Sequence, residues 1–157
     1  LIVYTKYDVQ ARESLWDVLS SFNPGVAPWF FGGDFNIVTC PEEKKGCGPF
    51  PRRASETFIS IMENNELLDA GFSGDPFTWC NNQYGNQRSW SCLDRFLVNG
   101  AALSAFLDIK ISHMVCGLSD HSPLHLTMKA RSENVCFIHF PSSWVDGADF
   151  LDIVRNS

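Results

Sequence analysis

The stretch WFFGGDFN at residues 29–36 decides how the rest of the sequence is interpreted. It opens with an apolar run of strand length, and a pair of glycines then ends the run and lets a backbone or a ligand approach closely. Asp34 and Asn36 lie two residues apart, so on extended backbone their side chains point to the same side while Phe35 packs behind them. Polar groups at the end of a buried strand are typical of the working edge of an α/β enzyme.

The segments on either side predict alternating strands and helices. Apolar or alternating runs predict strands at residues 1–4, 29–33, 77–80, 90–98, 109–115 and 124–128. Apolar residues at helical spacing predict helices at residues 9–22, 54–65 and 101–106. The faces expected to be buried carry Leu15, Trp16, Leu19 and Phe22 in the first helix and Phe58, Ile61 and Met62 in the second. Residues 36–53 are expected to form a long polar loop, and 81–87 a turn. This order predicts a mixed α/β sandwich.

The composition limits the classes of protein that fit. Hydrophobic residues make up 45% and charged residues 19%, which favours a packed core over disorder. No run approaches the roughly 20 apolar residues of a membrane span, so no membrane partner is expected. The net charge of −6 argues against strong autonomous binding to nucleic acid, but it does not exclude an enzyme with metal-binding carboxylates. Lys44, Lys45, Arg52 and Arg53 could form a local basic patch or belong to a solvated loop.

The cysteines and the first residues bear on location and completeness. Six cysteines are present without a CxxC pair or a zinc-ligand spacing, so we expect reduced, mostly buried thiols. No signal peptide is recognisable, which predicts an intracellular protein in the nucleus or the cytoplasm. The chain opens at Leu1 inside a strand-like run, and we therefore expect a piece of something longer.

Three short clusters could carry chemistry: Asp34 with Asn36, Asp94 in LDR, and His121 in SDH. Carboxylate and amide oxygens suit a hard cation such as Mg²⁺, with Mn²⁺ as the alternative. His121 could contact a phosphate or transfer a proton, and Asp94 could fix its tautomer. Taken singly, the three clusters could equally be an Asx turn, a strand-end ion pair and a helix cap or ordinary loop.

Taken in order, the motifs resemble the second half of the endonuclease/exonuclease/phosphatase superfamily. They are GDFN at 33–36, FTW at 77–79, LDRFL at 93–97 and SDHSPL at 119–124. The intervening EEKKG at 42–46 and LLDAGFSG at 67–74 are similar to the endonuclease of plant LINE-type non-LTR retroelements. The resemblance covers residues 1–129. Residues 130–157 look like a tail or linker toward a missing downstream domain, a reverse transcriptase in such elements.

The resemblance implies an α/β fold, a partial four-layer sandwich of the pancreatic-deoxyribonuclease-like type that lacks its N-terminal strands. It implies a Mg²⁺-dependent phosphodiesterase whose partner is DNA, bound weakly. Carried over to this sequence, the resemblance implies that Asp34 activates or stabilises the attacking water, that Asn36 contacts phosphate, and that Asp94 orients His121. The implied residues are catalytic Asp34, Asn36, Asp94 and His121, metal-binding Asp120 and Asp34, and substrate-binding Thr78, Trp79, Arg95 and Ser119.

The sequence also departs from the family pattern. The family's early Asn, its metal-binding Glu and its catalytic Tyr or His belong to strands that precede anything in this sequence, and Cys92 stands where relatives usually carry Arg. We therefore expect weak Mg²⁺ binding, little or no cleavage, and poor stability of a sheet with an exposed apolar face. Two other readings stay open: a non-catalytic remnant or interaction module, and a phosphatase or phospholipase-type esterase.

Overall fold

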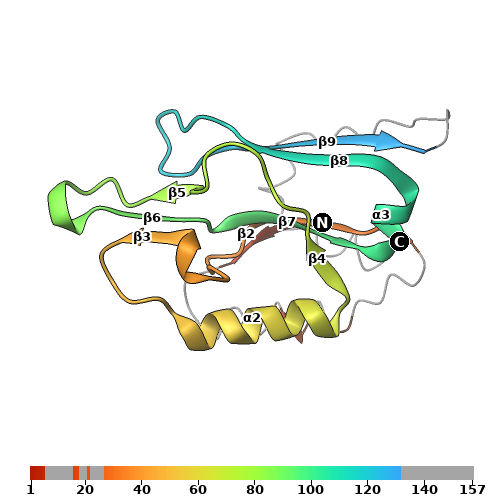
Figure 1. The fold of residues 1–157 in the computed structure, drawn as a ribbon, viewed down its shortest axis with the longest axis horizontal. Coiled ribbons are helices and arrows are strands. Elements are labelled where there is room, and N and C mark those ends of the chain that lie inside the picture. Colours follow the sequence, from red (N-terminus) through yellow and green to blue (C-terminus); the bar gives the residue numbers. More distant parts are fainter. Residues whose placement is uncertain (6–15, 18–20, 22–26, 132–157) are drawn as a thin grey trace, which may run out of the picture.

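A computed structural model of the chain describes residues 1–5, 16–17, 21 and 27–131. Figure 1 shows the arrangement of its helices and strands. In chain order, the elements are β1 (Ile2–Tyr4), β2 (Phe30–Asp34), η1 (Pro41–Glu43), β3 (Lys44–Gly46), α2 (Arg52–Asn64), β4 (Leu67–Asp69), β5 (Trp79–Cys80), η2 (Gly85–Gln87), β6 (Ser89–Ser91), β7 (Asp94–Asn99), α3 (Gly100–Ala105), β8 (Phe106–His113) and β9 (Leu124–Ala130).

A four-stranded sheet with the order β1-β2-β7-β4 lies at the centre of the described structure. β1 runs parallel to β2, whereas β2 and β4 both run antiparallel to β7. Helix α2 lies on one side of this sheet and the antiparallel pair β8–β9 on the other (Figure 1). Because side chains alternate along a strand, neighbouring residues of β2 and β7 face different layers. This alternation decides which charged groups can meet.

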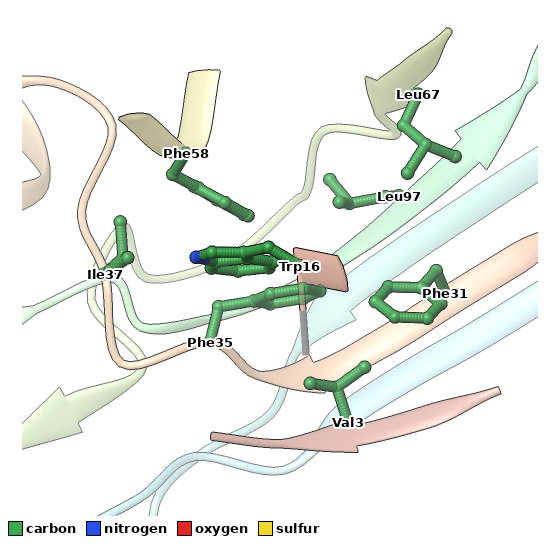
Figure 2. Close-up of a cluster of buried hydrophobic side chains, with 8 residues drawn as sticks. All are labelled: Val3, Trp16, Phe31, Phe35, Ile37, Phe58, Leu67 and Leu97. Atoms are coloured by element: carbon green, nitrogen blue, oxygen red, sulfur yellow. The ribbon is translucent and has the colours of Figure 1, made fainter. Parts of the chain in front are cut away.

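Aromatic side chains fill the layer between the sheet and α2 (Figure 2). Phe35 and Trp16 each lie 5.2 Å from the Phe58 ring, measured between ring centroids. Burying side chains of this size typically contributes about 1.5–3 kcal/mol each. The cluster of buried hydrophobic residues consists of Val3, Trp16, Phe31, Phe35, Ile37, Phe58, Leu67 and Leu97. It anchors the strand that leads directly into Asp34 and Asn36.

Gly33 lets β1 pair with β2 immediately before Asp34. Its φ is +139°, and a Cβ at this position would lie 2.0 Å from the carbonyl oxygen of Val3. A side chain is therefore excluded by the neighbouring backbone. The parallel pairing continues to Thr5, whose N–H donates to the carbonyl oxygen of Asp34 at 2.9 Å.

Two smaller sheets complete the structure. The three-stranded sheet β3-β6-β5 is antiparallel, and the pair β8–β9 forms the third sheet. An isolated antiparallel bridge joins Trp79 of β5 to His121, so the loop before β9 is connected to β5.

The predicted elements agree with the structure in type for most of the chain. The mixed α/β class is confirmed, and Phe58 is buried on α2 while Ile61 and Met62 pack against the core. The loop expected at 36–53 is partly wrong, since it contains η1 and β3 and since α2 already starts at Arg52. β4 was not predicted at all.

The strand predicted at 90–98 is interrupted, and the backbone hydrogen bonds explain why. The N–H of Cys92 donates to the carbonyl of Glu43, and the N–H of Leu93 donates to the hydroxyl of Thr78. These donors are thereby diverted from a continuous sheet, and β6 and β7 form as separate strands. The expectation of mostly buried thiols is also wrong for the described cysteines, because only Cys92 among them is buried.

Other expectations concern residues that the structure does not describe. Of the helix expected at 9–22, only Trp16, Asp17 and Ser21 are described; Leu15, Leu19 and Phe22 lie outside. The segment 132–157 lies outside as well, so the expected tail remains a prediction. None of the helices in the described part of the chain has the length and apolar character that crossing a bilayer requires.

β1 forms an edge of the central sheet among the described residues, and its outer side chains are solvent-accessible. Ile2 is 59% exposed and Tyr4 is 77% exposed. Exposed apolar groups on a sheet edge favour association with another surface. The expected poor stability stays a prediction.

Candidate active site

Asp34, Asp94 and His121 meet where β2 ends and β7 begins. Asp34 and Asp94 are register partners, so both side chains emerge on the β8–β9 side of the sheet. The Nδ1 atom of His121 lies 2.9 Å from Asp94 Oδ2, and its Nε2 atom lies 4.0 Å from Asp34 Oδ2. One ligand atom from each residue lies within 4.8 Å of the others. Three residues that are up to 87 positions apart in the sequence therefore form one group.

The loop of His121 is held by backbone hydrogen bonds to β5. The N–H of Cys80 donates to the carbonyl of Asp120 at 3.0 Å, and the N–H of Ser122 donates to the carbonyl of Thr78 at 2.7 Å. The hydroxyl oxygen of Ser119 accepts from the N–H of His121 at 3.0 Å. These bonds fix the imidazole in front of the two carboxylates.

The contact with Asp94 determines the proton position on His121. An ionised carboxylate can only accept hydrogen bonds, so the Nδ1–H of His121 donates to Asp94. Nε2 is then the nitrogen that faces Asp34. A carboxylate–histidine pair of this kind orients the ring and fixes its tautomer.

The carboxylate of Asp34 is held in place by hydrogen bonds from Asn36. The backbone N–H of Asn36 donates to Asp34 Oδ1 at 2.8 Å, and its side-chain amide donates to Asp34 Oδ2 at 2.9 Å and to the carbonyl of Thr5 at 2.6 Å. Burial raises the pKa of Asp34 to about 6, because desolvation outweighs the hydrogen bond from the Asn36 backbone. Nearby Asp94 adds to the rise through charge repulsion. The site thus contains a carboxylate whose ionised form a bound cation would stabilise.

Thr78 and Trp79 occupy different environments. Thr78 is 0% exposed, and its hydroxyl oxygen accepts from the N–H groups of Leu93 and Asp94 at 2.9 and 3.0 Å. The expected contact of Thr78 with substrate is therefore corrected: its hydroxyl supports Asp94 from the interior. Trp79 is half-buried, and its Nε1–H donates to Asp120 Oδ2 at 3.1 Å.

Arg95 does not reach the site, which corrects its expected contact with substrate. It follows Asp94 on β7, so alternation turns it to the α2 side, where it is 3% exposed. Its guanidinium donates to Glu43 Oε2 at 2.8 Å and Asp69 Oδ2 at 2.9 Å, and also to the carbonyls of Ile37 and Cys92. We name Arg95, Glu43 and Asp69 the closed network.

The closed network contains two residues that sequence reasoning missed, Glu43 and Asp69. Burial opposes ionisation of Glu43, but the hydrogen bonds and charge of Arg95 outweigh it and hold the pKa of Glu43 below its ordinary value. Glu43 also accepts from the N–H and hydroxyl of Thr39 at 2.6 and 2.8 Å, which closes the loop after Asn36. Strand alternation starting from Asp94 would have indicated that Arg95 faces inward.

Asp120 and Ser119 lie beside the group rather than in it. Both residues are exposed. Asp120 contacts Trp79, and Ser119 accepts a hydrogen bond from the His121 backbone. Their roles toward a metal or a substrate stay predictions. Cys92 is buried between β6 and β7, and burial raises the pKa of its thiol to about 12. A neutral thiol offers no cation to a phosphate.

The donor set fits a divalent cation. Two carboxylates and an imidazole lie close together, one carboxylate is desolvated, and oxygen donors are those that Mg²⁺ and Mn²⁺ prefer. This group could thus contribute ligands to a metal ion.

Comparison with solved structures identifies the architecture. The endonuclease domain of TRAS1, a telomere-specific non-LTR retrotransposon, matches with a TM-score of 0.56 and 18% identity over 84% of this chain and 56% of its own. The AP endonuclease LMAP from Leishmania major gives 0.55 and 18% over 75% and 42%. The 3′ phosphatase NExo (D146N) from Neisseria, bound to a product DNA hairpin, gives 0.53 and 17% over 76% and 52%.

This chain spans about half the length of each of these structures. No protein-family model matches it, and no curated protein sequence does. The structural likeness, together with the central sheet and its flanking layers, identifies the fold predicted from the motifs. The chain has the DNase I-like fold of these three structures.

Proposed function

We propose that this chain carries part of the active site of a Mg²⁺-dependent DNA endonuclease, similar to those of plant LINE-type retroelements. The observation that supports it most is the meeting of Asp34, Asp94 and His121 within 4.8 Å. We further propose that residues 1–129 form the endonuclease portion and 130–157 a linker toward a reverse transcriptase. On this proposal the parent protein works inside the cell, in the nucleus or the cytoplasm.

The proposed mechanism divides the work among five side chains. Asp34, with Asp120 nearby, would hold the cation, for which Mn²⁺ is the alternative to Mg²⁺. When bound, the cation supplies charge stabilisation to the phosphoryl oxygens and lowers the pKa of water. Asp94 holds the Nδ1–H of His121, which leaves Nε2 to contact the phosphate or to exchange a proton with water. Asn36 keeps the Asp34 carboxylate in place.

Nicking of supercoiled plasmid tests this proposal. With the whole chain and Mg²⁺ we expect weak nicking, absent in EDTA and reduced by about 10² or more in His121→Ala, the scale of a positioned proton transfer. His125→Ala is the matched control, because His125 is exposed on β9. Equal nicking by both variants would refute the role of His121. Robust cleavage by the wild-type chain would contradict the expected weakness.

A phosphatase activity is the second candidate. One of the similar structures is a 3′ phosphatase, and the same three residues could act on a phosphate monoester. Phosphate release from a 3′-phosphorylated oligonucleotide, compared with plasmid nicking, separates the two activities. If neither reaction occurs at any protein concentration, the non-catalytic reading is favoured.

A further inference from the structure

A second group of charged residues lies on the three-stranded sheet, outside the proposed active site. The Nζ atom of Lys45 lies 5.2 Å from the centroid of the Trp90 ring, and the guanidinium carbon of Arg88 lies 4.9 Å from it. We name Lys45, Arg88 and Trp90 the cationic patch. Neither Lys45 nor Arg88 forms a salt bridge with any described carboxylate. Two like charges are thus held together without an acidic partner among the described residues, although the net charge of the chain is −6.

The strand register places the cationic patch on the opposite face from the site. Lys45 and Cys80 are the register partners of Trp90, whereas Ser91 is the partner of Trp79. Adjacent residues of β6 point to opposite faces, so Trp90 and Trp79 lie on different sides of this sheet. The contact of Trp79 with Asp120 belongs to the site, and the cationic patch does not.

The backbone beneath the patch is tightly fixed. Gly46 has a φ of +100°, and a Cβ there would lie 2.1 Å from the carbonyl oxygen of Arg88. β3 therefore approaches β6 more closely than a side chain would permit. On the opposite face, the Nζ atom of Lys44 donates to the hydroxyl of Ser89 at 3.3 Å. The backbone positions that carry Lys45 and Arg88 are thus held close to each other.

We propose that the cationic patch binds the phosphate backbone of nucleic acid, independently of cleavage at the site. Lys45 and Arg88 are both exposed and rest over the Trp90 ring, so the ring favours their position while both charges stay accessible to an anion. Tyr84 is 90% exposed in the loop that joins β5 to β6, close along the chain to Arg88, and offers a ring on which a base can stack. Combined cations and aromatic rings favour nucleic acid over an acidic peptide.

The inference draws on the proposed function only for its choice of nucleic acid. Binding measured in EDTA is independent of metal-supported cleavage, so an inactive site would leave the test intact. The probe is a fluorescein-labelled 20-nucleotide single strand, compared with the corresponding duplex, and fluorescence anisotropy is recorded for the whole chain at several NaCl concentrations.

The decisive variant is Lys45→Gln/Arg88→Gln, and Lys129→Gln/Arg131→Gln is its control. The control removes the same two residue types from exposed positions at the end of β9. We expect the patch variant to bind about tenfold more weakly at low salt, with a salt slope smaller by roughly 1.4–1.8, because two phosphate contacts are lost. The control should change affinity less than about twofold.

Three results would overturn the proposal. The first is an equal loss in both double variants, which would indicate a general charge effect. The second is unchanged binding in the patch variant. The third is competition by polyglutamate as strong as that by unlabelled DNA, which would assign the surface to acidic proteins. Trp90→Leu provides a further measurement: loss of the ring under intact cations should weaken binding severalfold, and circular dichroism verifies that each variant is folded.

Discussion

Asp94 and Arg95 are neighbours on β7, yet they belong to two charged groups with opposite properties. Arg95 lies in the closed network, where each partner is an acid or a carbonyl within hydrogen-bonding distance and the guanidinium is 3% exposed. Asp94 lies in the open group with Asp34 and His121, which contains no permanent cation, and burial raises the pKa of Asp34 to about 6. A buried guanidinium between two acids holds a fold together, whereas two acids without a permanent cation favour an external ligand.

Removing the cation from the closed network should give the largest effect. In Arg95→Met, Glu43 and Asp69 keep their charges without a partner, so we expect a loss of about 3–5 kcal/mol in the free energy of unfolding. Urea unfolding followed by circular dichroism measures it. Arg52→Met is the control: its ion pair with Glu56 is exposed, and its loss should cost at most about 0.5 kcal/mol. Similar losses in the two variants would remove the distinction between the closed network and surface charges.

The next effect should come from the hydroxyl that supports Asp94. Thr78→Val leaves the N–H groups of Leu93 and Asp94 without their acceptor, which should destabilise the protein by about 1–3 kcal/mol. Thr78→Ser retains the acceptor and should recover most of this loss. If Val and Ser variants unfold at the same urea concentration, the two hydrogen bonds contribute nothing and the role assigned to Thr78 is wrong.

The open group should bind cations in a pH-dependent way. Asp34 must lose its proton to act as a ligand, and its pKa of about 6 means that protons compete below that pH. We expect Mn²⁺ affinity, measured by electron paramagnetic resonance, to be steady above pH 7 and to fall by up to about tenfold per unit below pH 6. Asp34→Asn should weaken binding and abolish this dependence. An unchanged pH profile in that variant would transfer the titration to another group.

The smallest effect concerns stability without a cation. Because the pKa of Asp34 is raised in the folded state, its ionised form costs stability above about pH 6, and the cost disappears as the pH falls through 6 toward 3.8. Asp34→Asn should therefore raise the Tm at pH 7.5 by about 2–4 °C and leave it nearly unchanged at pH 4. Scanning calorimetry at the two pH values measures the difference. A lower Tm at pH 7.5 would mean that hydrogen bonding of the carboxylate outweighs its desolvation.

The sequence contained most of the open group but little of the closed network. Asp34 ends an apolar strand, Asp94 begins one and His121 lies three residues before one, and such strands are recognisable from local patterns. Glu43 lies 52 residues before Arg95, in a loop without periodicity, so their pairing arises only after the strands have assembled. The sequence nonetheless held one usable signal, the alternation that turns Arg95 away from Asp94.

Short strands were the main source of error in the fold. β3 and β4 contain three residues each, too few to display a period of two. β4 pairs with β7 across about thirty residues, and β3 pairs with β6 across more than forty, so the sheet as a whole supplies what the local sequence lacks. The burial of Thr78 has the same origin, because its hydroxyl meets N–H groups that only the break between β6 and β7 leaves unpaired.

The adjacency of Asp94 and Arg95 makes this part of the chain more sensitive to length than to composition. Inserting or deleting one residue just before β7 would exchange the two faces, bringing a guanidinium against Asp34 and a carboxylate against the ring of Phe58. In a library of variants, many single substitutions of Leu97 or Val98 by other apolar residues would survive, whereas single-codon insertions and deletions here would abolish both groups together. Such a chain tolerates many amino-acid substitutions but few insertions or deletions.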